Sequence, residues 1–285
     1  MIALGNCASL RRWRNVLCAP ILLAIAAVST TAQTQTPTPA PSPARTDVSV
    51  ALVLAVDTSF SVSNSRFELQ KQGYAAAFRN PRVLNAIRSL STQSIAVTMF
   101  QWTGPFLHVV AVDWGQIKDE ASADAFADAI AGAPRQLFRG GTSISGAIDY
   151  ARDLLAHSPF RGARRIIDIS GDGSNNTGRS VTVARDEAVA DGVIINGLPI
   201  LTVEPGLDRY YYDNVIGGPD AFMIPVANYD NFADAILKKL LNEIAAEPDR
   251  HQIVTKAPSQ TRLSLRTGFW QAVGFQFGRP DATIR

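Results

Sequence analysis

The stretch "VSVALVLAVDTSFS", residues 48–61, joins an apolar run to a carboxylate and to hydroxyls at every second position. The run from Val48 to Ala55 is typical of a strand that is buried on both faces, as the strands of parallel sheets are. Asp57, Ser59 and Ser61 follow it at once. Such residues often cap a helix or close a turn, but their alternate spacing also lets one loop direct three oxygen atoms to a common point.

Strand-like and helix-like segments alternate after this stretch. The further strand-like runs are "SIAVTMFQW", "FLHVVAVDW", "RRIIDIS", "VIINGLPIL" and "AFMIPV", and the helix-like segments lie at 66–80, 121–131, 143–156, 181–191 and 232–245. This alternation predicts an α/β fold, with a doubly wound, mostly parallel sheet and helices on both faces. Only "TGP" separates the second and third strands, which predicts a hairpin and one antiparallel edge strand. Pro81 and Gly192 stand where the first and fourth helices are expected to end.

The first 32 residues have the layout of a secretory signal peptide. Three arginines between residues 11 and 14 precede an apolar stretch at 16–28, and small residues follow, so that cleavage is expected after Ala32. The alternative is a membrane anchor, but the apolar stretch is shorter than the roughly 20 residues that a membrane span needs. We therefore expect a secreted, periplasmic protein without a stable membrane span after cleavage.

The composition limits the classes of partner. The chain has 285 residues, 46% of them hydrophobic and 18% charged, which fits one compact domain with accessory segments. The arginines of residues 1–32 account for the net positive charge, so the mature chain gives no reason to expect nucleic acid or an anionic membrane as a partner. Both cysteines, Cys7 and Cys18, would leave with the signal peptide, and stability is then expected to come from packing.

Four segments are expected along the chain. They are a signal peptide at 1–32, a Pro/Thr/Ala-rich linker at 33–47, a folded domain at 48–246 and a C-terminal tail at 247–285. The linker alternates proline with small polar residues, which favours an extended tether. The tail contains "TGFWQAVGFQFG", and the sequence leaves open whether this is a strand that docks on the core or a tail with aromatic anchors.

Three polar clusters lie where strand-like runs end or helix-like segments begin. They are "DTSFS" at 57–61, "RGGTSISGA" at 139–147 and "ISGDGSNNTG" at 169–178. In an open parallel sheet, the loops at the carboxyl ends of the strands converge on one crevice. Asp57 and Asp172 would supply carboxylates there, and Ser59, Ser61 and Thr142 hydroxyls. Mg²⁺ favours such an all-oxygen environment, and Mn²⁺ or Ca²⁺ could also bind.

Each cluster alone has an ordinary structural explanation, because "DTSFS" can cap a turn, "GGT" can start a helix and "GDG" can form a turn. Their joint order is much rarer by chance, and it favours the metal site. A calcium loop is the less favoured alternative for "GDGSNNTG", since acidic residues are missing at Ser174 and Asn176. Asn175 and Asn176 either order this loop or touch a ligand. "DRYYYDN", residues 208–214, is either an aromatic recognition patch or a surface loop packed by tyrosine rings.

The three clusters and their order resemble the von Willebrand factor type A (vWA) domain, whose metal-ion-dependent adhesion site (MIDAS) uses D-x-S-x-S, a threonine from a second loop and an aspartate from a third. The resemblance covers about Val48 to Ala246 and implies that five residues coordinate the metal: Asp57, Ser59, Ser61, Thr142 and Asp172. It also implies a protein-binding module of adhesion or assembly, whose cation takes an Asp or Glu side chain from a partner protein. The secreted layout is similar to that of a bacterial group within this superfamily.

Two other functions stay open on the sequence. A hydrolase could use the cation as a Lewis acid on phosphate esters. However, neither a nucleophile elbow nor a triad pattern is present, and Ser59 stands where a haloacid-dehalogenase-like site would have a second aspartate. A scaffold with a vestigial metal site is the third possibility. The sequence favours a binding module that is not an enzyme.

Overall fold

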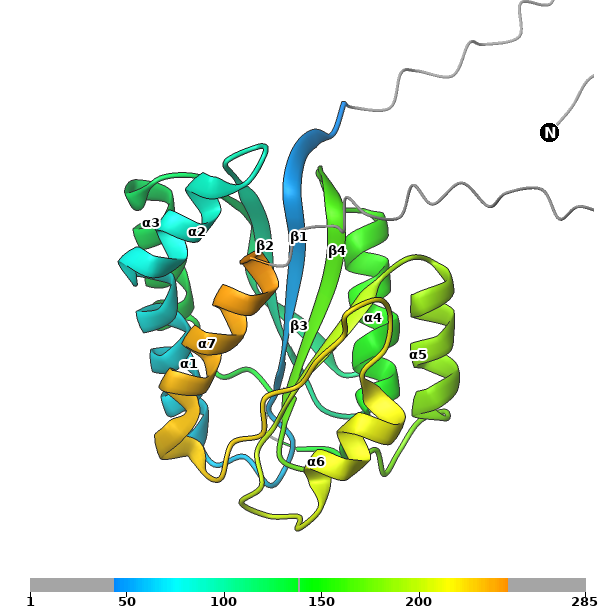
Figure 1. The fold of residues 1–285 in the computed structure, drawn as a ribbon. Helices are drawn as coiled ribbons and strands as arrows, with labels where there is room; N and C mark the ends of the chain where they lie inside the picture. The colour runs from blue at the N-terminus through cyan, green and yellow to red at the C-terminus, as the bar shows by residue number, and fades with distance from the viewer. Residues whose placement is uncertain (1–43, 138, 246–285) are drawn as a thin grey trace, which may run out of the picture. The chain divides into compact units, whose positions relative to one another are not determined.

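Residues 44–137 and 139–245 are described by the structure, a computed structural model, and they contain one five-stranded sheet (Figure 1). Its strands are β1 (Thr46–Asp57), β2 (Ile95–Trp102), β3 (His108–Ile117), β4 (Phe160–Gly171) and β5 (Ile194–Pro199). Their spatial order is β3-β2-β1-β4-β5, and only β3 runs antiparallel to its neighbour. The predicted hairpin and the antiparallel edge strand are therefore confirmed.

The central strand β1 carries the first polar cluster at its carboxyl end. All of its residues from Val48 onward are buried, as the continuous apolar run predicts. In register, Asp57 pairs with Trp102 of β2, and Val56 pairs with Ser170 of β4. The carboxyl ends of these three strands therefore lie at the same edge of the sheet, where the loops with the predicted metal ligands begin.

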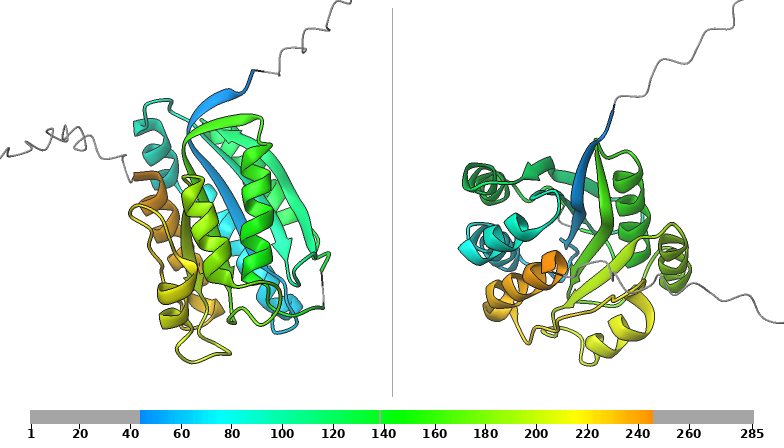
Figure 2. Two further views of the ribbon diagram at one scale, coloured as in Figure 1. Left: turned by 90° about the vertical axis from the view of Figure 1, so that its right-hand side faces the viewer. Right: turned by 45° about the horizontal axis from the view of Figure 1, so that its top comes forward.

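Helices cover both faces of the sheet, as predicted. One face carries α1 (Asn64–Phe78), α2 (Pro81–Ser89), α3 (Glu120–Gly132) and α7 (Phe232–Ala245), which follows the 3₁₀ turn η2 (Tyr229–Asn231). The other face carries α4 (Ile144–Ala156), α5 (Val181–Ala190), α6 (Leu207–Tyr210) and the π-helical turn η1 (Tyr211–Val215). Figure 2 shows α4 and α5 side by side over this second face. Alternate side chains of β1 pack into the two cores, as the period of a strand requires.

Local sequence explains where two of the helices begin and end. The sequence pattern predicts one helix at 66–80 and misses α2, because Pro81 is also a good first residue of a new helix once Asn80 caps it. The side chain of Asn80 accepts the N–H of Arg82. At the end of α5, Gly192 adopts a positive φ of 74° and donates its N–H to the carbonyl of Val189, as expected for a C-terminal cap.

The apolar run at 221–226 does not form a regular strand. Isolated bridges join Met223 to Gly197 and Val226 to Ile200. Pro225 lies between them and has no N–H to donate, so the ladder beside β5 is interrupted.

The predictions for the two ends of the chain concern mostly residues that the structure does not describe. The predicted signal peptide and tail, and the linker up to residue 43, lie outside the described residues. Within the described ranges, no helix is both long enough and apolar enough to cross a membrane.

Candidate metal centre

The first polar cluster starts at the last residue of β1. Asp57 is fully buried, and its Oδ1 accepts the backbone N–H of Ser59 at 2.7 Å. This bond closes an Asx turn that reverses the chain at the end of the strand. The hydroxyl oxygens of Ser59 and Ser61 lie 3.2 Å apart. The alternate spacing therefore brings both serine hydroxyls to one place.

The third cluster meets the first at this edge. Asp172 follows β4 directly and is fully buried. Its Oδ1 accepts a hydrogen bond from the hydroxyl of Ser61, 111 residues away in the sequence. Its Oδ2 accepts a 2.9 Å hydrogen bond from the hydroxyl of Tyr229 and lies 3.6 Å from Nη1 of Arg66. Both carboxylates of the predicted site are thus held in the same small region of the fold.

Thr142 lies in the second cluster, just before α4. Its N–H donates to Oδ1 of Asn176 at 2.9 Å, and its carbonyl accepts the N–H of Asn176 at the same distance. Its Oγ1 lies beside Gly173, where an added Cβ would be 3.5 Å away. Asn175 makes a parallel link, since its Oδ1 accepts the N–H of Ser145. The two asparagines therefore order the third loop against the second, which is one of the two roles that the sequence suggests.

Glycines allow the three loops to approach each other closely. A Cβ at Gly171 would lie 3.0 Å from Oδ2 of Asp57 and 3.0 Å from the hydroxyl of Tyr211. A Cβ at Gly141 would lie 2.7 Å from Oδ1 of Asn176. Both positions therefore need a residue without a side chain.

Among the buried polar atoms at this edge that lack a hydrogen-bond partner within the described ranges are Oδ2 of Asp57 and the hydroxyl oxygen of Tyr211. A buried polar atom without a partner is costly, so it points to a ligand that belongs there. The atoms around it are carboxylate and hydroxyl oxygens, which suit a hard divalent cation. No group of three or more His, Cys, Asp or Glu side chains gathers to hold a metal in the part of the chain that is described. The hydroxyls would therefore be essential to the coordination shell.

The electrostatics of the site also fit a cation. Burial, and next the neighbouring Asp172 carboxylate, raises the pKa of Asp57 to about 7, although hydrogen bonds from Ser59 oppose this. Two carboxylates in one dry site repel each other, and a bound cation relieves that repulsion. Burial is also the main cause that raises the pKa of Tyr211 and Tyr229, and nearby carboxylates add to it. Both phenols therefore stay protonated and are available as donors.

The sequence did not predict the tyrosines of this site. "DRYYYDN" separates into three roles: Tyr211 is buried at the site, the hydroxyl of Tyr210 accepts the N–H of Asn175 at 3.3 Å, and Tyr212 is exposed. The segment is thus neither a uniform patch nor a plain surface loop. Because the three tyrosines are consecutive and identical, the sequence does not indicate which of them is buried. Tyr229 lies far from both carboxylates in the sequence, and no motif connects it to them.

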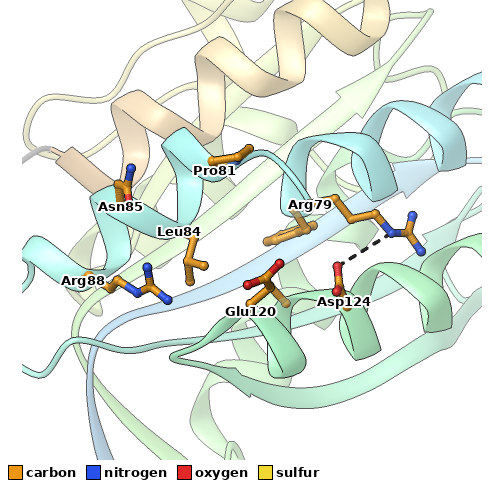
Figure 3. Close-up of a pocket in the computed structure, with 9 residues that line it drawn as sticks. Arg79, Pro81, Leu84, Asn85, Arg88, Glu120 and Asp124 are labelled. Carbon is orange, nitrogen blue, oxygen red and sulfur yellow. Dashed lines mark ion pairs between the residues drawn. The ribbon is translucent and has the colours of Figure 1, made fainter.

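Figure 3 shows a separate hollow between α2 and the beginning of α3. It is lined by residues of the α1–α2 junction and of α3, including Arg79, Leu84, Glu120 and Asp124. Nε of Arg79 lies 3.9 Å from Oδ1 of Asp124, so these charges are paired within the protein. The hollow contains none of the residues predicted to bind metal.

Comparisons with known proteins agree with this architecture. A family model described as "Protein of unknown function (DUF1194)" matches residues 47–248, and no curated protein matches the sequence. Similar solved structures include proximal thread matrix protein 1 from the mussel byssus (14% identity, TM-score 0.51), a von Willebrand factor type A protein from Catenulispora acidiphila (15%, 0.50) and the pilus adhesin SpaC from Lactobacillus rhamnosus GG (16%, 0.50). Each match covers 70% of this chain but only 49%, 43% and 31% of the other chain, respectively. The fold is that of a vWA domain.

Proposed function

This chain belongs to the DUF1194 family, and we propose that it is a secreted module that binds a protein partner through a divalent cation. The observation that carries this proposal is the buried, unpartnered Oδ2 of Asp57 beside a cluster of serine hydroxyls. In the proposal, the ligands of the cation are the five residues suggested by the sequence: Asp57, Ser59, Ser61, Thr142 and Asp172. Mg²⁺ is the first choice for this donor set, and Mn²⁺ or Ca²⁺ is the alternative.

The chemistry of the donor set favours binding of an acidic group. Three of the five proposed ligands are neutral hydroxyls, so a bound cation would keep much of its positive charge and attract an Asp or Glu side chain of the partner. Two arginines add positive charge nearby. Arg66 donates to the carbonyl of Ser61 at 2.8 Å, and Arg135 donates to the carbonyl of Thr58 at 3.0 Å. Charge of this sign would steer an acidic partner to the site.

Exposed aromatic side chains lie at the same edge of the sheet. Phe60, within the first loop, is 82% exposed, and Phe106, in the turn between β2 and β3, is 91% exposed. The turn belongs to this edge because β2 ends at Trp102, which pairs with Asp57. Exposed aromatic residues are enriched at protein interfaces. They support a protein as the partner, rather than a small acid.

A magnesium-dependent hydrolase is the alternative function. It would need a general base or nucleophile beside the cation. Asp57 and Asp172 serve as ligands in the proposal, and Oε2 of Glu204 is engaged by the N–H of Ser174 at 2.7 Å. None of these three carboxylates is therefore an obvious base, which favours the binding function. A scaffold with a vestigial site remains the third alternative.

The test measures capture and catalysis on one protein preparation. Immobilised protein should retain specific proteins from a periplasmic extract in Mg²⁺ and release them when a chelator is added. Thr142→Ala should lose this capture, whereas Thr202→Ala, which removes an exposed hydroxyl outside the site, should retain it. Phosphate release from a panel of esters is followed in parallel. Robust Mg²⁺-dependent release that Asp57→Ala abolishes would overturn the proposal in favour of the hydrolase.

A further inference from the structure

A second group of charged side chains is buried between the sheet and α7. Lys239 and Asp168 are 0% exposed and Glu243 is 1% exposed. Nζ of Lys239 lies 2.7 Å from Oδ1 of Asp168 and also contacts Oε1 of Glu243. Charged residues are almost never fully buried unless they are paired. Here one amine forms ion pairs with two carboxyl groups. None of the three residues belongs to the candidate metal centre.

The surroundings of this group are dry and closely packed. Asp168 lies in the middle of β4 and pairs in register with Asn196 of β5. Nδ2 of Asn196 donates to Oε1 of Glu243 at 3.0 Å. The ring of Phe222 covers the amine, with its centroid 5.4 Å from Nζ of Lys239. The reactive groups are thus enclosed by protein atoms and held in place.

The two carboxyl groups are incompletely satisfied. Among the residues that the structure describes, neither carboxyl oxygen of Asp168 has a hydrogen-bond partner, although Oδ1 lies 2.7 Å from Nζ of Lys239, and Oε2 of Glu243 has none either. Burial raises the pKa of Asp168 to about 7, against the opposing effect of the Lys239 amine. Low dielectric surroundings disfavour the ionised forms of both an amine and an acid. The carboxyl group of Asp168 is therefore protonated more readily here than in water, while it lies in contact with the amine of Lys239.

We propose that Lys239 and Asp168 form an intramolecular amide bond, with Glu243 as the proton-transfer group. The neutral Nζ attacks Cγ of the protonated Asp168 carboxyl, so that an N–C bond forms and the bond from Cγ to its hydroxyl oxygen breaks. Glu243 takes one proton from the amine and delivers it to the leaving hydroxyl. One water molecule is released, and Glu243 returns to its starting form. The reaction needs neither an oxidant nor a cofactor.

The geometry supplies what this condensation needs. The groups are already in contact, and well-oriented groups within one molecule react as if at about 10⁵–10⁸ M concentration. Enclosure away from solvent disfavours the reverse hydrolysis. The bond would link α7 to β4 covalently. It would reduce the conformational entropy of the unfolded chain, as a disulfide does. The described residues contain no cysteine that could form such a link.

Mass spectrometry of the folded, full-length chain tests the proposal. The intact wild-type protein should be lighter than the unlinked chain by one water. Trypsin cannot cleave after an amidated lysine, so the digest should contain residues 166–179 joined to residues 239–250, also lighter by one water. An intact mass without this loss, together with a free 240–250 peptide, would overturn the proposal and leave an ordinary buried ion pair.

Three variants distinguish a loss of the amide bond from a loss of folding. Lys239→Arg keeps a long basic side chain but removes the attacking amine, so it should show no water loss. Lys238→Arg changes the exposed neighbouring lysine on the same helix and should keep the link. Glu243→Gln should slow or abolish linking, and its circular dichroism spectrum shows whether it is folded. Complete linking in folded Glu243→Gln would overturn the role of Glu243 in proton transfer.

Discussion

The hydroxyl group of Tyr229 donates a 2.9 Å hydrogen bond to Oδ2 of Asp172. Tyr229 stands just before α7, and Asp172 follows β4 directly. One hydrogen bond therefore joins the 3₁₀ turn that leads into α7 to the candidate metal centre. Partners of this kind orient metal ligands and tune their basicity.

Tyr229→Phe should weaken Mg²⁺ binding. The substitution removes the hydrogen bond to Asp172 and keeps the ring, and the loss of such a partner typically lowers metal affinity by about 10- to 100-fold. Isothermal titration calorimetry measures the effect. Tyr212→Phe removes an exposed hydroxyl and should bind Mg²⁺ like the wild type. If both variants bind Mg²⁺ with the same affinity, Tyr229 does not support the metal ligands and the prediction is wrong.

Gly171→Ala should damage the same site by steric crowding. The new Cβ would lie 3.0 Å from both Oδ2 of Asp57 and the hydroxyl of Tyr211, and overpacking of this kind costs about 1–3 kcal/mol of stability. Mg²⁺ affinity should fall as well. Gly132→Ala is the control, because no atom lies within 4 Å of its added Cβ. Urea unfolding compares the two, and a Gly171→Ala protein as stable as the control would contradict the prediction.

The metal-free protein should lose stability as the pH rises from about 4 to about 7. The pKa of Asp57 is raised from 3.8 to about 7 in the folded chain, so the folded state binds more protons than the unfolded state in this interval. The contribution of Asp57 is therefore present below pH 4 and is lost as the pH passes 7. Urea unfolding in chelator measures the slope. Asp57→Asn should flatten this slope, because it removes the carboxyl group that titrates.

Phe60→Ser should abolish partner capture without changing Mg²⁺ affinity. The side chain is 82% exposed within the first loop, so its loss removes apolar contact area but no ligand atom. Val183→Ser is the matched control, since Val183 is 47% exposed on α5. Pull-down and calorimetry on the same preparations check both points. Capture that survives Phe60→Ser, or that is lost equally in Val183→Ser, would argue against this aromatic contact.

Much of the fold could be predicted from local patterns. The continuous apolar run before Asp57 predicted a central buried strand, and the short "TGP" link predicted the antiparallel edge. The pattern failed at Pro81, which both follows one helix and starts the next. It failed again at residues 221–226, where Pro225 interrupts the hydrogen bonds that a regular strand would need.

The sequence by itself determined the α/β class and the candidate donors of the metal centre, because apolar periodicity and the order of polar clusters are written along the chain. Only the tertiary structure decided which distant side chains join them. Tyr229 reaches Asp172 because α7 packs across the sheet. "LKKL" contains two adjacent lysines, yet Lys238 is exposed and Lys239 is buried against Asp168. Burial depends on which face of a helix meets the sheet, and that is settled by packing between segments far apart in the sequence.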